Sequence, residues 1–91
     1  MQIENFGSNQ VVVWANNATV FYSYNTPVAA FILGRNQPPE YDNKGRAKNY
    51  VKTAKFWSVT TSKHINSWLR SKGIDPKDVE TVEQDYLDKL I

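Results

Sequence analysis

The hydrophobic pattern in the first third of the chain predicts a β-hairpin. Two apolar runs, residues 10–15 (QVVVWA) and residues 18–25 (ATVFYSYN), are separated by two asparagines. Asparagine tolerates the positive φ angles of a two-residue hairpin loop, and such a loop places Val13 opposite Val20. Apolar side chains occupy both faces of the two strands, so we expect both faces of the sheet to be covered.

Residues 28–33 (VAAFIL) and residues 49–57 (NYVKTAKFW) predict two further strands. Pro27 interrupts the pattern before the first of them, because proline cannot donate a hydrogen bond in a central ladder. Residues 34–48 combine glycine, a Pro-Pro pair and the dipeptides Asp-Asn and Lys-Gly. This composition predicts a long exposed loop, and loops of that length are often functional.

Two helices are predicted to follow the strands. Ile65, Trp68 and Leu69 are spaced at i, i+3 and i+4 and predict a helix over residues 61–72. Gly73 is expected to end this helix, because glycine adopts the left-handed conformation that often follows a helix C-terminus.

The second helix is predicted over residues 76–90, where Pro76 suits the first helical position. Apolar residues recur along one face of this predicted helix, at Val79, Val82, Tyr86 and Leu90. The predicted element order is therefore ββββαα. It belongs to the α+β class, with a small antiparallel four-stranded sheet followed by two C-terminal helices in a single domain over residues 1–91.

This arrangement leaves one face of the predicted sheet without a cover. Two short helices can cover one face, and the other face needs a loop, a curled sheet or another subunit. We therefore expect the protein to be a homo-oligomer.

Charge is segregated along the chain. The net charge of +2 divides into −1 over residues 1–34, +7 over residues 35–72 and −4 over residues 73–91. A basic middle and an acidic C-terminal segment form two different surfaces. The basic middle is where we expect an anion to bind.

Two short segments resemble a known group of proteins. S-Y-N-T-P-V-A (residues 23–29) and W-S-V-T-T-S-K-H-I-N (residues 57–66) are similar to the SYxTxVA strand and the YSxTTxKHxxxFL strand-to-helix junction of a group of small phage and prophage proteins. With the preceding hairpin, the resemblance covers roughly residues 11–69. It implies a phage origin and an accessory role, and it carries over no catalytic or binding residue.

The residue types present argue against several kinds of chemistry. The chain has no cysteine and one histidine, His64, so we expect no disulfide and no metal site. No nucleotide-binding or metal-ligand motif occurs, and no cofactor is expected. His64 lies near hydroxyl side chains, but no acid is close in sequence, and hydroxyls before a helix usually cap it. We expect a non-enzymatic protein.

Membrane association is not expected either. The first residues, MQIENFGSNQ, lack the basic start and apolar run of a signal peptide. No segment approaches the roughly 20 apolar residues that a spanning helix needs. With the resemblance to phage proteins, these patterns indicate a protein of the host bacterial cytoplasm.

The candidate binding site combines the predicted fourth strand with the start of the first helix. Cations and aromatic rings alternate there, and a helix start offers backbone N–H groups and hydroxyls to a phosphate. The candidate residues are Arg46, Lys48, Tyr50, Lys52, Lys55, Trp57, Thr60, Thr61, Ser62, Lys63 and His64. The alternative is that the rings belong to the core and the lysines only keep an edge strand soluble.

Three kinds of partner fit this site. We favour a small nucleotide-like anion, sequestered as a signal of host defence, and this choice rests on analogy with other phage proteins. DNA or RNA is the second candidate, although the acidic C-terminal segment argues against a continuous basic stripe. The third is a host enzyme, inhibited through exposed aromatic side chains or through the acidic residues 76–91.

Overall fold

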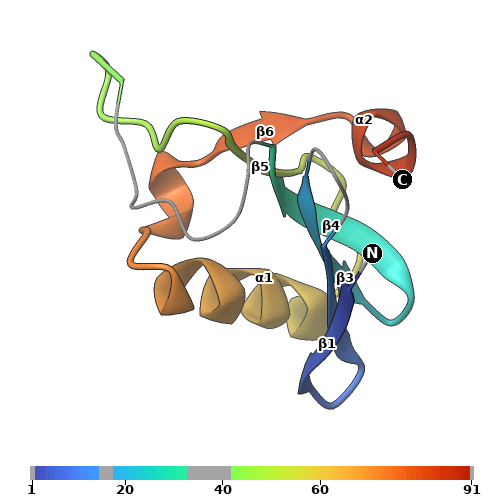
Figure 1. Cartoon of the computed structure of the whole chain (residues 1–91). Helices are drawn as coiled ribbons and strands as arrows, with labels where there is room; N and C mark the ends of the chain where they lie inside the picture. Colours follow the sequence, from blue (N-terminus) through green and yellow to red (C-terminus); the bar gives the residue numbers. More distant parts are fainter. Residues whose placement is uncertain (1, 15–17, 33–41, 91) are drawn as a thin grey trace.

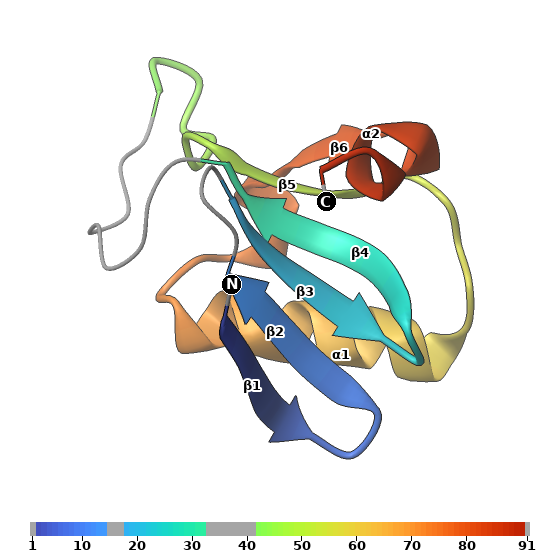
Figure 2. The same ribbon diagram turned by 45° about the vertical axis from the view of Figure 1, so that its right-hand side comes forward.

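The computed structural model describes residues 2–14, 18–32 and 42–90. It confirms the α+β class: six strands form one sheet in the order β1-β2-β3-β4-β5-β6, with a helix on each face (Figures 1 and 2). The strands are β1 (Gln2–Gly7), β2 (Gln10–Trp14), β3 (Thr19–Ser23), β4 (Thr26–Phe31), β5 (Tyr50–Thr53) and β6 (Glu80–Val82). The helices are α1 (Val59–Ser71), the single 3-10 turn η1 (Pro76–Asp78) and α2 (Gln84–Asp88).

The first predicted hairpin has the predicted register. β2 pairs antiparallel with β3, and Val13 lies opposite Val20. Both faces of this hairpin are covered, as predicted. Phe21 belongs to a buried cluster between the sheet and α1, whereas Val20 belongs to a second cluster on the opposite face.

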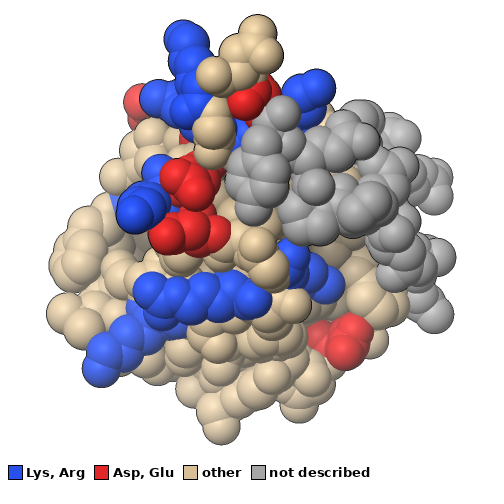
Figure 3. All heavy atoms as spheres, turned by 90° about the vertical axis from the view of Figure 1, so that its left-hand side faces the viewer, with Lys and Arg blue, Asp and Glu red and all other residues tan. Residues whose placement is uncertain are grey.

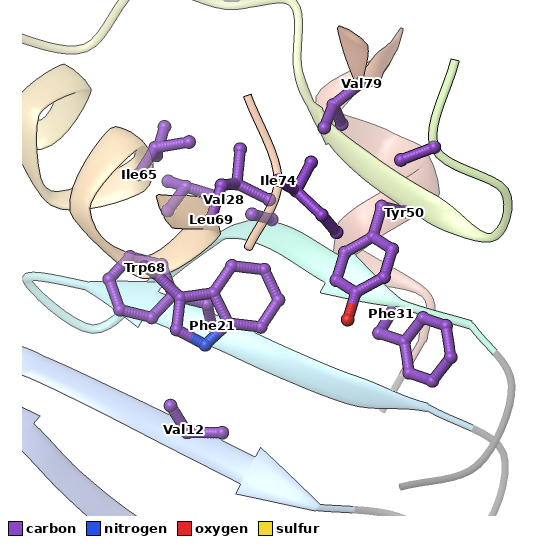
Figure 4. Close-up of a cluster of buried hydrophobic side chains, with 12 residues drawn as sticks. Val12, Phe21, Val28, Phe31, Tyr50, Ile65, Trp68, Leu69, Ile74 and Val79 are labelled. Atoms are coloured by element: carbon purple, nitrogen blue, oxygen red, sulfur yellow. The ribbon is translucent and has the colours of Figure 1, made fainter. Parts of the chain in front are cut away.

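The larger cluster lies between the sheet and α1 (Figure 4). Trp68 of α1 is fully buried in it, and its ring stacks on Phe21 with the ring centroids 5.3 Å apart. Ile65 and Leu69, the other members of the predicted helical stripe, are buried beside it. This packing confirms the helix that the i, i+3, i+4 pattern predicts.

α1 begins two residues earlier than predicted, because Ser58 caps it. The Ser58 side-chain oxygen accepts a hydrogen bond from the backbone N–H of Thr61 at 3.0 Å. At the other end Gly73 has a φ of 78° and ends the helix, as predicted. The backbone N–H of Ile74 donates to the carbonyl of Leu69 at 3.0 Å, which closes the last turn and brings Ile74 into the core.

Pro27 lies inside β4, whereas the sequence predicts a strand over 28–33 that begins after it. The register between β3 and β4 shifts at this point, with Tyr22 opposite Pro27 and Phe21 opposite Ala29. A β-bulge takes one residue out of the ladder, so a proline without an N–H is tolerated there. The β3–β4 turn is tight, with positive φ at both of its central residues, Tyr24 and Asn25.

The prediction of four strands is wrong, because β1 and β6 extend the sheet at its two edges. β1 (QIENFG) contains three polar residues and a glycine among its six residues, so it carries no strong strand signal. β5 is shorter than the predicted strand over 49–57, since the chain leaves the sheet after Thr53. β6 pairs with β5 in parallel, so β5, α1 and β6 form a βαβ unit instead of two helices appended to a meander.

The predicted helix over 76–90 is also wrong. This segment forms η1, then β6, and then α2, which begins at Gln84. Val79 is buried under α1, whereas Val82 packs into the cluster on the opposite face of the sheet. Two apolar residues three apart share one side of a helix but point to opposite faces of a strand, so their spacing alone does not distinguish the two.

α2 covers the second face of the sheet over β3, β4 and β5. Leu87 is fully buried there, against Val20, Ala30 and Val51. The cover that the sequence analysis assigned to a loop, a curled sheet or another subunit therefore comes from the chain's own last helix. Oligomerisation does not follow from an uncovered face.

The predicted loop over 34–48 is described only in its second part, because residues 33–41 lie outside the described residues. Residues 42–46 are exposed, as predicted, whereas Ala47 is buried. The Asp42 carboxylate organises this part: its Oδ1 accepts from the backbone N–H groups of Lys44 and Arg46, both at 2.9 Å. The hydrogen bond from Arg46, assisted by that from Lys44, lowers the pKa of Asp42 below its usual value.

Candidate functional site

A groove of about 190 Å³ runs between the end of β5 and the first turns of α1, and we call it the junction groove. One wall is formed by the end of β5, with Lys52, and by the segment that follows it, with Lys55 and Phe56. Ser62 and Asn66 of α1 line the other wall. No acidic residue lines this groove in the described part of the chain, so its electrostatic character is basic.

The two lysines of the junction groove are held in different ways. Lys52 points to the α1 side of the sheet, and its Nζ donates a hydrogen bond to the carbonyl oxygen of Pro76 at 2.9 Å. Because an ammonium group has three donors, two remain for a ligand. The Nζ of Lys55 lies 4.0 Å from the centroid of the Trp57 ring, a cation–π contact that fixes the charge above the ring.

Gln84 of α2 anchors the Trp57 side chain through a hydrogen bond. The indole Nε1–H donates to the side-chain oxygen of Gln84 at 3.1 Å, and the same oxygen accepts from the Thr53 hydroxyl at 2.8 Å. The amide nitrogen of Gln84 donates to the carbonyl of Pro27 at 2.6 Å. One side chain therefore joins α2, the bulge of β4, the end of β5 and the segment that carries Trp57.

The segment between β5 and α1 exposes apolar side chains. Phe56 is 69% exposed, Val59 62% and Trp57 41%. Large apolar side chains that cluster on a surface are typical of a contact site. Phe56 and Trp57 therefore do not belong to the core, which removes one part of the alternative interpretation of this segment.

The two motifs that carry the resemblance to phage proteins meet in space. The Ser23 hydroxyl, from the first motif, lies 3.1 Å from the Thr61 hydroxyl and 2.9 Å from Nδ1 of His64, both from the second. The ring of Tyr24 stacks on His64 with the centroids 5.7 Å apart. This polar cluster fixes the β3–β4 turn against the start of α1.

Ser23 and His64 have the separation of a nucleophile and its base, but Ser23 is only 2% exposed. Its hydroxyl contacts two protein side chains and is not presented at the surface. The contact gives His64 and Thr61 a structural role. Thr61 is buried as well, so neither hydroxyl of this cluster is presented to a phosphate at the helix start.

The predicted site residues fall into five groups. Lys52, Lys55 and Ser62 line the junction groove, and Trp57 lies beside it. Thr60 and Lys63 are exposed on the first turns of α1, while Thr61 and His64 belong to the polar cluster. Arg46 and Lys48 line a separate hollow of about 510 Å³ together with Asp42 and Glu80. Tyr50 lies in the core, where its ring stacks on Phe31 at 4.5 Å.

The basic middle of the sequence does not form one basic surface. On the face that carries the C-terminal end of α1 and the segment after residue 41, basic and acidic side chains lie side by side (Figure 3). Lys77 and Asp75 form an exposed ion pair of this kind at 3.7 Å. In the described residues, the junction groove is lined by basic residues and by no acidic residue.

Sequence reasoning did not find Ser23, Asn66 or Gln84. Asn66 follows Ser62 by one helical turn, a spacing that could have placed both on one wall once Ser62 was chosen. Apart from Asp88, one turn further along α2, the side-chain partners of Gln84 in the described residues lie 27 to 57 residues away, so the sequence gives no signal for them. Its role depends on where α2 packs.

Further features limit the chemistry of the described residues. No group of three or more His, Asp or Glu side chains in the described residues could hold a metal ion. Within the same residues, no helix has the length and apolar character needed to cross a membrane.

Comparison with known proteins gives a family but no function. No curated protein and no solved structure matches the chain. One family model matches residues 1–89, which is almost the whole chain. The protein belongs to this family, DUF8033, a family of unknown function.

Proposed function

We propose that the protein binds a ligand that carries a phosphate group and a flat base, and that it does so in the junction groove without catalysing a reaction. The observation that carries the proposal is the pairing of two lysines with an exposed Phe56 in a groove that no acidic residue of the described chain lines. The ligand is either a free nucleotide or a short single-stranded nucleic acid, which share this chemistry.

The electrostatic part of the site comes from Lys52 and Lys55 on one wall. Lys52 keeps two ammonium donors free after its bond to Pro76. Across the groove, Ser62 and Asn66 supply neutral donors and acceptors. A phosphate held between these walls would receive charged hydrogen bonds from one side and neutral ones from the other.

The stacking part comes from Phe56. Its ring is 69% exposed and borders the groove, whereas the ring of Trp57 already has the Lys55 ammonium on it. Stacking a base on an exposed aromatic ring contributes about 1–3 kcal/mol. Phe56 is therefore the platform on which we expect the base to lie.

The size of the groove favours an extended ligand. Its volume of about 190 Å³ is below the roughly 300–1,000 Å³ of ordinary small-molecule pockets. Such a groove holds one phosphate or one base and leaves the rest of the ligand outside. A single strand can continue over the protein surface, whereas a free nucleotide would need further contacts outside the groove.

The role that we propose in the cell rests on the resemblance to phage proteins and differs between the two ligands. A free nucleotide bound in this way would be a defence signal that the protein removes from the host. A bound single strand would instead make the protein an accessory factor in phage nucleic-acid metabolism. A third role, inhibition of a host protein, is favoured by one observation: Val59 and Trp57 are exposed next to Phe56.

The test is direct binding. Fluorescence anisotropy with labelled single-stranded DNA and RNA, and calorimetry with mono- and cyclic dinucleotides, separate the two ligand sources. We expect Lys55→Glu and Phe56→Ala each to weaken binding about tenfold or more. Lys89→Glu is the matched control, because it makes the same charge change on the opposite face of the sheet and should leave binding within about twofold.

Two results would overturn the proposal. One is that neither class of ligand binds at low salt, in which case the exposed apolar side chains point to a protein partner. The other is that Lys89→Glu weakens binding as much as Lys55→Glu does, which would mean that net charge and not the groove attracts the ligand.

A further inference from the structure

β1 is an edge strand with an open outer side. It pairs with β2 on one side only, and no other described segment lies beside it (Figure 2). An open edge presents a row of backbone N–H and C=O groups that can pair with another strand. Six residues of strand offer an edge of about 20 Å.

Edge strands are usually protected against pairing, and β1 carries little protection. Lysine, proline and very short length are the common devices. β1 has no lysine and no proline, and Glu4 is its only charge. β6, at the opposite edge, is by contrast only three residues long and lies between η1 and α2.

The exposure of Ile3 indicates that the open edge of β1 is a contact site. Ile3 is 69% exposed, the largest exposure of any large aliphatic side chain among the described residues. It lies opposite Val13, on the sheet face that also carries Val20 and α2. α2 packs on β4 and leaves this end of the face open, so an apolar side chain is in water beside unpaired backbone groups.

We propose that β1 pairs antiparallel with β1 of a second copy of this chain, so that two sheets join into one across a two-fold axis. A second copy fits this edge because a two-fold interface is self-complementary: each β1 offers the other the same donors and acceptors in reverse order. The proposal does not depend on the ligand of the junction groove.

The alternation of β1 restricts the register. Ile3 and Asn5 point to the α2 side of the sheet, and Glu4 and Phe6 point to the α1 side, where Phe6 packs on Phe21. Residues opposite each other in an antiparallel pair share a face, so a residue on the α2 side faces another on that side. A residue of β1 therefore lies on the two-fold axis, and because Phe6 lies at the irregularity between Asn5 and Gly7, the candidates are Ile3, Glu4 and Asn5.

Two of these three registers are unfavourable. With Glu4 on the axis, two carboxylates lie directly opposite each other, which is destabilising. With Asn5 on the axis, the pairing extends over the irregularity between Asn5 and Gly7. With Ile3 on the axis, the two exposed Ile3 side chains meet and Glu4 lies opposite Gln2 of the other copy. We expect this register.

The experiment measures mass in solution over a range of concentrations. Sedimentation velocity of the wild-type protein should show a species of twice the 10.5-kDa chain mass. Ile3→Lys places a charge at the axis and should raise the dimer dissociation constant at least about tenfold, while the circular dichroism spectrum stays unchanged. Phe56→Lys makes the same kind of change at another exposed apolar residue and should leave the dimer intact.

Hydrogen exchange of the wild-type chain provides a second measurement that needs no variant. Amides of β1 should become more protected as the protein concentration rises, and those of β6 should not change. A wild-type chain that stays monomeric at millimolar concentration would overturn the proposal. A dimer that Ile3→Lys leaves intact, or one in which β1 amides gain no protection, would overturn it as well.

Discussion

The side-chain oxygen of Ser23 lies 2.9 Å from Nδ1 of His64, and this contact joins the β3–β4 turn to α1 across 41 residues of sequence. Ser23 is buried and also contacts the Thr61 hydroxyl at 3.1 Å. The pair therefore belongs to a small polar cluster inside the fold, and the clearest test of its role is stability.

Ser23→Ala should destabilise the protein by about 1–3 kcal/mol, because it leaves two side chains without their buried partner. Chemical denaturation followed by circular dichroism measures this change. Ser67→Ala removes a hydroxyl from an exposed position of α1 and should change stability by less than about 0.5 kcal/mol. Equal effects of the two substitutions would contradict a structural role for the cluster.

Gln84→Ala should release Trp57, because the amide of Gln84 accepts from the Trp57 indole and donates to Pro27. We expect the indole N–H signal of Trp57 to shift in the NMR spectrum and to exchange faster with water. Binding to the junction groove should weaken as well, since Lys55 rests on the ring that Gln84 positions.

Asp85→Ala is the control for this variant, as the next residue of α2 is exposed and no side-chain partner of it is seen in the described structure. If both variants leave the Trp57 signal in place, Gln84 does not anchor the ring.

Leu87→Ala should destabilise the chain by about 2–5 kcal/mol, the usual cost of removing a buried leucine side chain. Because α2 covers the sheet within one chain, this loss should not depend on protein concentration. Tyr86→Ala, on the exposed side of the same helix, should cost much less. A loss from Leu87→Ala that shrinks at high concentration would show instead that a second subunit helps to cover this face.

Acid should open the turn that Asp42 organises. The backbone hydrogen bonds from Arg46 and Lys44 lower the pKa of Asp42 in the folded protein. The ionised carboxylate therefore stabilises the turn above the ordinary pKa of an aspartate, and this contribution is lost as the pH falls through the lowered pKa.

NMR titration should show the amide signals of Lys44 and Arg46 moving together at a pH below the usual range of an aspartate. Asp42→Asn should remove this transition, because asparagine does not titrate. A transition that persists in Asp42→Asn would belong to another group.

Much of the fold could be predicted from local pattern. The Val13–Val20 register followed from the loop length and alternation, and α1 followed from the spacing of Ile65, Trp68 and Leu69. These features depend on contacts within a few residues or across a single hairpin, where periodicity and turn chemistry act directly.

The sequence predicted which segment carries the candidate site but not which of its side chains are exposed. Alternating cations and rings pointed to residues 50–57, but the buried or exposed state of each ring depends on packing across the sheet. Tyr50, the first residue of β5, is buried in the core, whereas Trp57, four residues after the end of the same strand, is exposed.

The sequence by itself determined the α+β class, the central hairpin, α1 with its glycine end and the segment that carries the basic groove. Only the tertiary structure decided that residues 76–90 split into a turn, a strand and a short helix, since Val79 and Val82 had partners on opposite faces of the sheet. It alone brought Ser23 to His64 and Gln84 to Trp57. The reason is physical: local propensity is a weak preference, and burial against residues distant in sequence outweighs it.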